Sequence, residues 1–288
     1  MESPNRSLTI GAAQVTAVLD LVGEFPASLA RAFPDVEQTA WKRYRRRYPE
    51  TFSGMDRWRL SIWCFLVHAR SRLILVDTGV GASGTPGADW IGSPGGLPQE
   101  LANAGVDPDL IDVVVLTHLH LDHVGWNLVW EEDQPRPRFR NARYLVQRAD
   151  WELFADQADD NDSEAFEYCV RPLETLGMLD VLDGDRVLDG ELTVLHTPGH
   201  TPGSQSLLVH SGDDAVLLWG DVANHPAQID EPAWCSVGDL QPEQAPSTRR
   251  RLLDRVVAEQ MWLGPAHFPE PFGTVASEEG GRRWLPRG

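Results

Sequence analysis

The order of apolar and polar positions along the chain predicts a series of strands. Short apolar runs rich in β-branched residues and bounded by turn-forming residues are typical of buried strands. Such runs cover residues 61–69, 72–79, 111–118, 142–147, 191–197, 205–211, 215–221 and 262–267. The first two are separated only by the polar pair Arg70–Ser71, which predicts a hairpin.

Helical spacing of apolar residues alternates with these runs. It covers residues 97–105, 148–156, 163–177 and 245–261. Gly105 is expected to end the first of these helices, and Ser247 or Thr248 to cap the start of the last. The segment 81–96 is rich in Gly, Pro and Ser, which predicts a loop.

The pattern as a whole predicts the α/β class. Two β-rich halves, each followed by helices, favour sheets that pack face to face with helices outside. The chain has 288 residues, 42% of them hydrophobic, which is enough for a large core. We expect a single domain over residues 1–288, with residues 1–60 as a lid or dimer-contact extension.

One basic cluster stands out near the N-terminus. Residues 41–50 read WKRYRRRYPE, and five of them are cationic: Lys42, Arg43, Arg45, Arg46 and Arg47. One interpretation is a solvated helix whose arginine stems pack on the surface. The other is a lid or dimer contact near a pocket, and the sequence does not choose between them.

The net charge limits the partners that we expect, and the cysteine content indicates the compartment. The formal charge is −18, which disfavours binding to nucleic acid and to anionic lipid. Three scattered cysteines, Cys64, Cys169 and Cys235, are typical of a reducing compartment. The start of the chain lacks the pattern of a signal peptide, and no run approaches the roughly 18 apolar residues of a membrane span. We therefore expect a cytoplasmic protein with no nucleic-acid or membrane partner.

The candidate chemistry begins directly after the buried run at 111–118. The stretch THLHLDHVGWN, residues 117–127, places three histidines and an aspartate within six positions. Alternation puts His118 and His120 on one side if the strand conformation persists. Asp122 and His123 then lie in the following turn. One metal ion could bind the first pair and a second ion the other pair.

Three more donor side chains follow other predicted strands. His200 lies in TPGHTPGS, Asp221 ends AVLLWGD, and His267 lies in GPAHFP. Imidazole and carboxylate suit zinc and its first-row relatives. Because two divalent ions repel each other, they need an anionic bridge, which Asp221 and a hydroxide can supply. We predict two divalent ions, zinc first, with manganese, cobalt or iron as alternatives. His68 and His210 are expected to be ordinary surface or core histidines.

At these residues the chain resembles the metallo-β-lactamase superfamily of dinuclear metal hydrolases. The motif HLHLDH carries the resemblance, and LVDTG, TPGHTPGS and LLWGD support it in the expected order. The resemblance implies an αβ/βα four-layer sandwich of two mixed β-sheets flanked by helices. Within the superfamily the chain is most similar to methyl parathion hydrolase and its lactonase relatives, which also implies a possible homodimer.

The resemblance also implies a role for each site residue. The first ion would be held by His118, His120 and His200, the second by Asp122, His123 and His267, with Asp221 bridging both and Asp77 supporting the ligands. One position departs from the pattern, because quorum-quenching lactonases carry a tyrosine where this chain has Asn224. The departure argues against acyl-homoserine lactone as the specific substrate.

The predicted site favours hydrolysis of a small molecule. Two ions lower the pKa of a bridging water, and the resulting hydroxide attacks a lactone or ester carbonyl, with phosphotriesterase side activity. Asp122 or Asp221 would shuttle the proton. A thiolester or β-lactam hydrolase is the alternative on the same metal core. A nucleic-acid processing enzyme is disfavoured by charge, and a redox di-iron protein by the lack of room for a flavin domain.

Substrate contacts are the least constrained part of the prediction. Asn224 and His225 directly follow the bridging aspartate and are candidate contacts. Four of the eleven tryptophans lie near the metal motifs, namely Trp126, Trp130, Trp219 and Trp234. They either pack in the core or line the pocket mouth, where they would favour an apolar substrate. Trp126 is the tryptophan that we include among the candidate substrate contacts.

Overall fold

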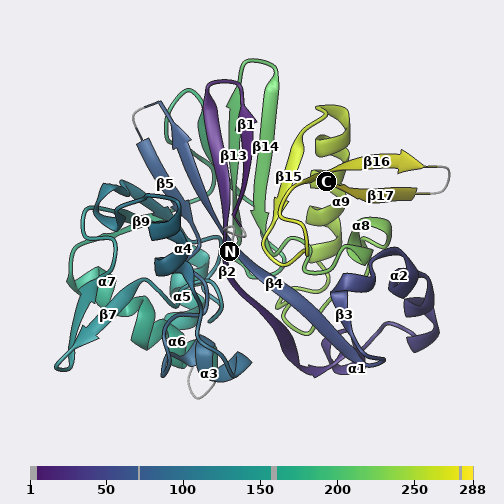
Figure 1. Ribbon diagram of the computed structural model, residues 1–288, viewed down its shortest axis with the longest axis horizontal. Helices are drawn as coiled ribbons and strands as arrows, with labels where there is room; N and C mark the ends of the chain where they lie inside the picture. Colours follow the sequence, from purple (N-terminus) through teal and green to yellow (C-terminus); the bar gives the residue numbers. More distant parts are fainter. Residues whose placement is uncertain (1–4, 71, 157–160, 279–280, 288) are drawn as a thin grey trace.

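Two mixed β-sheets face each other in the computed structural model, with helices on both outer sides (Figure 1). The structure describes residues 5–70, 72–156, 161–278 and 281–287. Apolar side chains of both sheets meet between them, including Val67, Leu207 and Leu218. The predicted α/β class and the four-layer sandwich are confirmed.

The larger sheet contains the strands of the N-terminal half. Its strands are β1 (Arg6–Ile10), β2 (Ala13–Ser28), β3 (Phe52–Ser53), β4 (Arg57–Ala69), β5 (Arg72–Val76), β6 (Val113–Val115), β9 (Arg143–Gln147) and β10 (Leu179–Leu182). The order is β1-β2-β4-β5-β6-β9-β10, with β3 paired to β4. Strands β4 and β5 are antiparallel, so the predicted hairpin is confirmed, although Ser71 lies outside the described residues. From β5 to β10 the pairing is parallel.

The second sheet contains the strands of the C-terminal half. Its strands, in spatial order, are β11 (Arg186–Val187), β12 (Leu192–His196), β13 (Gln205–Ser211), β14 (Asp214–Gly220), β15 (Trp262–Pro265), β16 (Gly273–Glu278) and β17 (Gly281–Pro286). The pair β14/β15 is parallel and the other neighbours are antiparallel. A separate small ribbon pairs β7 (Leu128–Glu131) with β8 (Gln134–Pro137).

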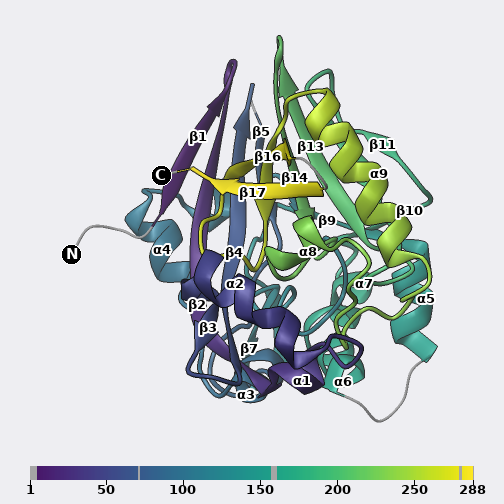
Figure 2. The ribbon, with the colours of Figure 1, turned by 90° about the vertical axis from the view of Figure 1, so that its right-hand side faces the viewer.

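The helices cover the outer faces of the two sheets. They are α3 (Pro86–Ile91), α4 (Leu97–Asn103), η3 (Pro108–Leu110), α5 (Arg148–Asp156), α6 (Asn161–Cys169), α7 (Arg171–Thr175), α8 (Ala227–Asp230) and α9 (Ala245–Ala258). Side chains of α4, α6 and α7 pack on the larger sheet, whereas Leu252, Leu253 and Val256 of α9 pack against Leu208 and Leu217 of the second sheet. Figure 2 shows α9 lying along the outer side of β13 and β14.

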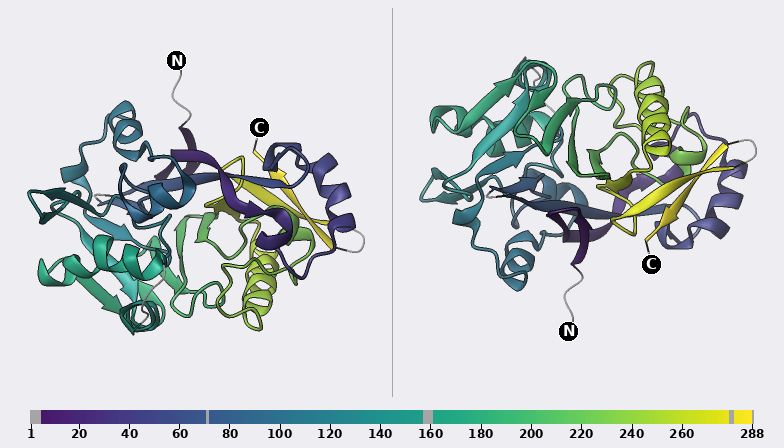
Figure 3. Two further views of the ribbon diagram at one scale, coloured as in Figure 1. Left: turned by 90° about the horizontal axis from the view of Figure 1, so that it is seen from below. Right: turned by 90° about the horizontal axis from the view of Figure 1, so that it is seen from above.

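The N-terminal part of the chain belongs largely to the sheet. Strand β2 pairs with β4 from Gln14 to Ser28, so this part of residues 1–60 lies in the larger sheet. The remainder forms α1 (Leu29–Ala32), η1 (Gln38–Ala40), α2 (Trp41–Arg47) and η2 (Pro49–Thr51). Figure 3 shows the N-terminal helices at the same end of the molecule as the C-terminal hairpin β16–β17. A role as lid or dimer contact stays a prediction for this remainder.

The basic cluster on α2 is largely paired within the chain. Arg47 contacts Asp230, the last residue of α8, and Arg43 contacts Glu231, the residue after it. The guanidinium carbon of Arg45 lies 4.5 Å from the centre of the Phe52 ring. These contacts support the interpretation of a surface helix with packed arginine stems.

One predicted helix cap and one predicted loop are wrong. Helix α9 begins at Ala245, so Ser247 and Thr248 lie inside its first turn, because Pro246 starts the helix without needing a donor. The segment 81–96 is not all loop, since Thr85 accepts a hydrogen bond from the backbone N–H of Ala88 and starts α3.

The expected helix over 163–177 is broken into two. Helix α6 ends at Cys169, Val170 leaves the helical region at φ −122°, and α7 starts at Arg171. Pro172 has no backbone N–H to donate to the carbonyl of Tyr168, four residues earlier, and its ring would clash with that carbonyl in a continuous helix, which explains the break. Within the described part of the chain, no helix is long and apolar enough to cross a membrane.

Candidate metal centre

Four loops at one edge of the sandwich bring the seven predicted ligands together. The loop after β6 carries His118, His120, Asp122 and His123, and the loops after β12, β14 and β15 carry His200, Asp221 and His267. All seven side chains are buried. Strand β6 stops at Val115, earlier than predicted, so His118 and His120 lie on an irregular segment.

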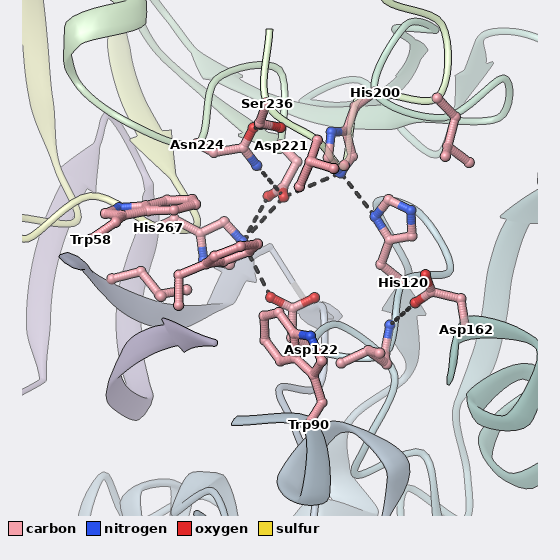
Figure 4. Close-up of a pocket in the computed structure, with 16 residues that line it drawn as sticks. Trp58, Trp90, His120, Asp122, Asp162, His200, Asp221, Asn224, Ser236 and His267 are labelled. Atoms are coloured by element: carbon pink, nitrogen blue, oxygen red, sulfur yellow. Dashed lines mark hydrogen bonds and ion pairs between the residues drawn. The ribbon is translucent and has the colours of Figure 1, made fainter. Parts of the chain in front are cut away.

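The donor atoms form three overlapping groups, each within 4.8 Å. The groups are His118, His120 and His200; His118, His123 and Asp221; and Asp122, His123 and His267. Asp221 also lies 3.4 Å from Nε2 of His200 and 3.1 Å from Nε2 of His267 (Figure 4). Asp221 therefore stands between two groups of donors, as a bridging carboxylate must.

Gly220 allows the end of β14 to approach the histidine loop. Its φ is +57°, and a Cβ there would lie 2.7 Å from Cβ of Thr117. A side chain at this position would collide with the residue just before His118. The glycine in the WGD motif therefore lets Asp221 reach the site.

Asp77 holds the histidine loop from behind. It accepts hydrogen bonds from the backbone N–H and the hydroxyl of Thr117, at 2.7 and 2.8 Å, and its Oδ2 lies 2.9 Å from Nδ1 of His123. Its own φ is +59°, a conformation that non-glycine residues rarely adopt. Asp77 therefore orients a candidate ligand without being one, as the resemblance implied.

Three other imidazoles are oriented in the same way. His118 Nδ1 lies 3.0 Å from the Thr117 hydroxyl, His200 Nδ1 lies 2.8 Å from Oδ1 of Asp239, and His267 Nδ1 lies 2.9 Å from the carbonyl oxygen of Ser61. With Nδ1 engaged, each ring turns its Nε2 towards the centre. Metal-binding histidines in proteins have this arrangement.

Unpaired atoms at the centre show that the donor set fits divalent cations. Among the described residues, Nε2 of His118 and Oδ1 of Asp221 are buried without a hydrogen-bond partner. The facing ring nitrogens of His123 and His267 lie 3.2 Å apart, and those of His120 and His200 lie 2.9 Å apart. Buried lone pairs that converge in this way are costly unless a cation binds them.

The charges at the centre divide the histidines into two kinds. Burial lowers the pKa of His118 and of His120 well below the usual value. Burial acts in the same direction on His123 and His267, but the nearby carboxylates, Asp221 foremost and Asp122 with it, together outweigh burial and raise the pKa of both rings. Since a metal ligand must be deprotonated, cation binding here requires these two rings to release protons.

A pocket of about 230 Å³ opens onto the centre. Its floor includes His120, Asp122, His200, Asp221 and His267. Its walls are largely apolar and are formed by Phe25, Trp58, Leu60, Trp90, Leu121, Val237 and Leu240. Figure 4 shows Trp58 and Trp90 on one side of the floor and Asp162 on the other.

Only one of the three predicted substrate contacts lines this pocket. Asn224 does so, and its side-chain N–H donates to Asp221 while its Oδ1 accepts from the Ser236 hydroxyl. Trp126 does not, because its indole N–H donates to the buried Asp20 at 2.9 Å, behind the pocket wall. The Trp126 prediction is wrong for that reason.

His225 is also not a pocket residue. Its Nδ1 accepts from the backbone N–H of Ala227, so Nε2 carries the proton and donates to the Thr51 hydroxyl at 2.9 Å. The ring is surrounded by aromatic side chains, with ring-centre distances of 5.1 Å to Trp41 and 5.3 Å to Phe52. Burial lowers its pKa to about 3. His225 therefore anchors the N-terminal segment to the loop after Asp221.

The tryptophans near the metal motifs pack away from the pocket. Trp219 is buried, Trp130 stacks on Tyr168, and Trp234 packs on Trp41. The pocket instead uses Trp58 and Trp90, which lie far from the motifs in the sequence. No local signal marked these two residues, because their place depends on how β4 and α3 pack.

Two polar residues behind His200 were also missed. Asp239 lies in a loop without a recognisable motif. Arg249 did carry a signal: it lies three, four and seven positions before Leu252, Leu253 and Val256, on the apolar face of α9. A charged residue on a buried helix face requires a partner inside the protein.

Comparisons with known proteins agree with this geometry. The family model described as "Metallo-beta-lactamase superfamily" matches residues 57–267. Over 240 residues the chain is 28% identical to an N-acyl homoserine lactonase of Bacillus sp, covering 79% of this chain and 86% of the lactonase. Over 220 residues it is 30% identical to the acyl-coenzyme A thioesterase MBLAC2 of Gallus gallus, covering 73% of each chain.

Solved structures share the fold over almost the whole chain. The hydrolase AbOPH, described as in the beta lactamase superfamily, has a TM-score of 0.82 at 22% identity and covers 100% of this chain and 99% of its own. AidC, described as a dizinc quorum-quenching lactonase, has a TM-score of 0.82 at 20% identity and covers 99% of this chain and 98% of its own.

Proposed function

The chain belongs to the metallo-beta-lactamase superfamily of metal-dependent hydrolases, and we propose that its substrates are uncharged lactones and esters. We propose phosphotriester hydrolysis as a side activity. The observation that carries the proposal is the pocket, whose walls are apolar and aromatic above a floor of candidate metal ligands.

The charge of the pocket separates this proposal from the alternatives. The described residues that line it include no lysine or arginine, whereas Asp122, Asp162 and Asp221 are acidic. β-Lactams carry a carboxylate, and coenzyme A esters carry phosphates, which proteins usually bind with cationic side chains. An uncharged lactone or ester needs no such partner.

The seven candidate ligands would hold two divalent ions, and we propose zinc. Support comes from the three donor groups and from AidC, which is described as a dizinc enzyme. When bound, such ions supply Lewis acidity and a water that is acidic near neutral pH. We propose His118, His120 and His200 around one ion, Asp122, His123 and His267 around the other, and Asp221 between them.

The chain's own side chains would then orient the substrate and move a proton. Trp58, Trp90 and Phe25 present flat apolar surfaces that hold the acyl or aromatic part and exclude water. Asp122 lines the pocket, next to His267 at 3.5 Å. Its carboxylate can therefore accept the proton of the attacking water and return it to the leaving oxygen of the substrate.

One observation favours a second candidate, a thioesterase. The relative from Gallus gallus is described as an acyl-coenzyme A thioesterase and shares 30% identity. The acyl chain of a thioester substrate would fit the same apolar wall. The acidic pocket argues against the coenzyme A part, so a thioester without phosphates would be the better substrate.

A hydrolysis panel with zinc-loaded protein tests the proposal. We expect turnover of lactones and aryl esters, weaker turnover of phosphotriesters, and little turnover of β-lactams or acyl-coenzyme A. Removal of metal with a chelator should abolish activity, and zinc, cobalt or manganese should restore it. Preference for acyl-coenzyme A over a neutral thioester of the same acyl chain would overturn the assignment in favour of the thioesterase.

Cytoplasmic location, a homodimeric state and the lack of nucleic-acid binding stay predictions. Cell fractionation, light scattering and a salt-dependent binding assay with RNA and DNA test them in turn. The charge of −18 supports the last of these.

A further inference from the structure

Arg249 of α9 is fully buried and contacts two loops of the metal centre. Its Nε donates to the carbonyl oxygen of Val222, the residue after Asp221. Its Nη1 donates to the carbonyl oxygens of Pro232 and Trp234, at 3.0 and 2.6 Å. A single guanidinium therefore joins the turn after β14 to the loop between α8 and α9.

The remaining side of the guanidinium faces Asp239. Nη2 of Arg249 lies 3.5 Å from Oδ2 of Asp239, and Oδ1 of the same carboxylate lies 2.8 Å from Nδ1 of His200. Asp239 also accepts from the backbone N–H of Ser236 at 2.9 Å. All three side chains, Arg249, Asp239 and His200, are buried, so water cannot substitute for these contacts.

The start of α9 packs directly on the loop that carries His200. The hydroxyl of Thr248 donates to the carbonyl oxygen of Pro198 at 2.6 Å. Gly199, at φ +143°, lies so close to Ala245 that a Cβ would approach its Cα to 2.6 Å. Neighbouring residues of one helix thus hold the loops of His200 and Asp221 at fixed places.

Stability alone does not explain a charged pair in this position. Burying an ion pair removes hydration from both partners, and apolar residues of similar volume often stabilise a core as well or better. Arg249 occupies the helix face that Leu252, Leu253 and Val256 share. What the guanidinium provides, and a leucine cannot, is several directed hydrogen bonds to the loops of the centre.

We propose that Arg249 is a positioning residue that sets the relative placement of His200 and Asp221, acting on His200 through Asp239. The inference rests on the proposed role of both residues as metal ligands. It implies that removing the guanidinium weakens metal binding by more than the loss of helix packing would explain.

The experiment compares Arg249→Met with Leu253→Ala in the full chain. Leu253 is buried on the same helix and contacts the apolar core, so its truncation destabilises the fold without touching the polar network. Zinc affinity is measured by competition with a chromophoric chelator, and geometry by the visible spectrum of the cobalt-loaded protein. We expect at least a tenfold loss of zinc affinity and an altered cobalt spectrum for Arg249→Met, and neither change for Leu253→Ala.

Asp239→Asn removes the negative charge of Asp239 and keeps a similar shape. It is the second variant to measure if Arg249→Met fails to fold. The asparagine oxygen can still accept from His200, so we expect a smaller loss of affinity than for Asp239→Ala. Zinc affinity within twofold of wild type in Arg249→Met, or in Asp239→Ala, overturns the inference. Failure of wild-type protein to bind two zinc ions would instead refute the proposed function, so the two failures are distinguishable.

Discussion

The floor and the wall of the pocket are built in different ways. On the floor, His200 and His267 are each fixed by a hydrogen bond to a residue behind them. On the wall, Phe25 and Trp58 meet through ring contacts, with centres 5.1 Å apart and nearly parallel. Directed bonds tolerate little change, whereas apolar packing accepts other side chains of similar volume. We therefore expect the floor to set the reaction class and the wall to set the substrate.

The largest expected effect comes from breaking the floor. Asp221→Ala removes the carboxylate that lies between both groups of donors, so we expect hydrolysis to fall by at least about a thousandfold. His120→Ala should act similarly. The fold should persist, as measured by circular dichroism. The control is Asp254→Ala, an exposed change on α9 that should leave hydrolysis unchanged. Full activity in Asp221→Ala would place the reaction at another site.

Changing the wall should affect substrate binding more than turnover. Trp90→Ala removes a half-buried pocket residue whose ring centre lies 5.5 Å from that of Phe25. We expect KM for an aryl ester or a long-chain lactone to rise roughly tenfold with little change in kcat. Trp130→Ala, which removes a stacked tryptophan outside the pocket, should leave both constants unchanged. Equal effects of the two changes would contradict the assigned wall.

Asn224 lies where floor and wall meet, and its effect should be smaller. Its side chain donates to Asp221 and accepts from Ser236, so both polar ends are engaged. Asn224→Ala should lower kcat by about fivefold to tenfold, because one directed bond to the carboxylate is lost. KM should stay nearly constant. A rise in KM with unchanged kcat would show that Asn224 contacts substrate instead.

His225 supports the wall from behind, and its change should appear in stability. Its pKa is about 3 in the folded protein against 6.5 for the free side chain, so the unfolded chain binds the proton more readily. The contribution of neutral His225 to the free energy of unfolding is therefore fully present above about pH 6.5. It declines by up to about 1.4 kcal/mol per pH unit as the pH falls towards 3. The difference in unfolding free energy between wild type and His225→Gln, measured with urea in chelator, should shrink over this range. A pH-independent difference would contradict the prediction.

The two regions also differ in how far the sequence predicts them. Each of the four motifs lies at the end of a strand or just after it, namely HLHLDH, TPGHTPGS, WGD and GPAH. Local spacing was enough to identify all seven residues that the structure brings together. Trp126 and His225 were chosen by the same criterion of closeness in sequence, and it failed for them. A side chain near a motif can point to either side of the loop, and Asp20 and Thr51 hold these two away from the pocket.

The sequence by itself determined the α/β class, the order of most strands and the donor set, because these depend on local patterns of polarity and on residue type. Tertiary structure decided the rest. It placed Trp58 of β4 and Trp90 of α3 over the site, and it buried Arg249 behind His200. Those placements depend on contacts between residues that are up to about two hundred positions apart, and local spacing carries no record of such contacts.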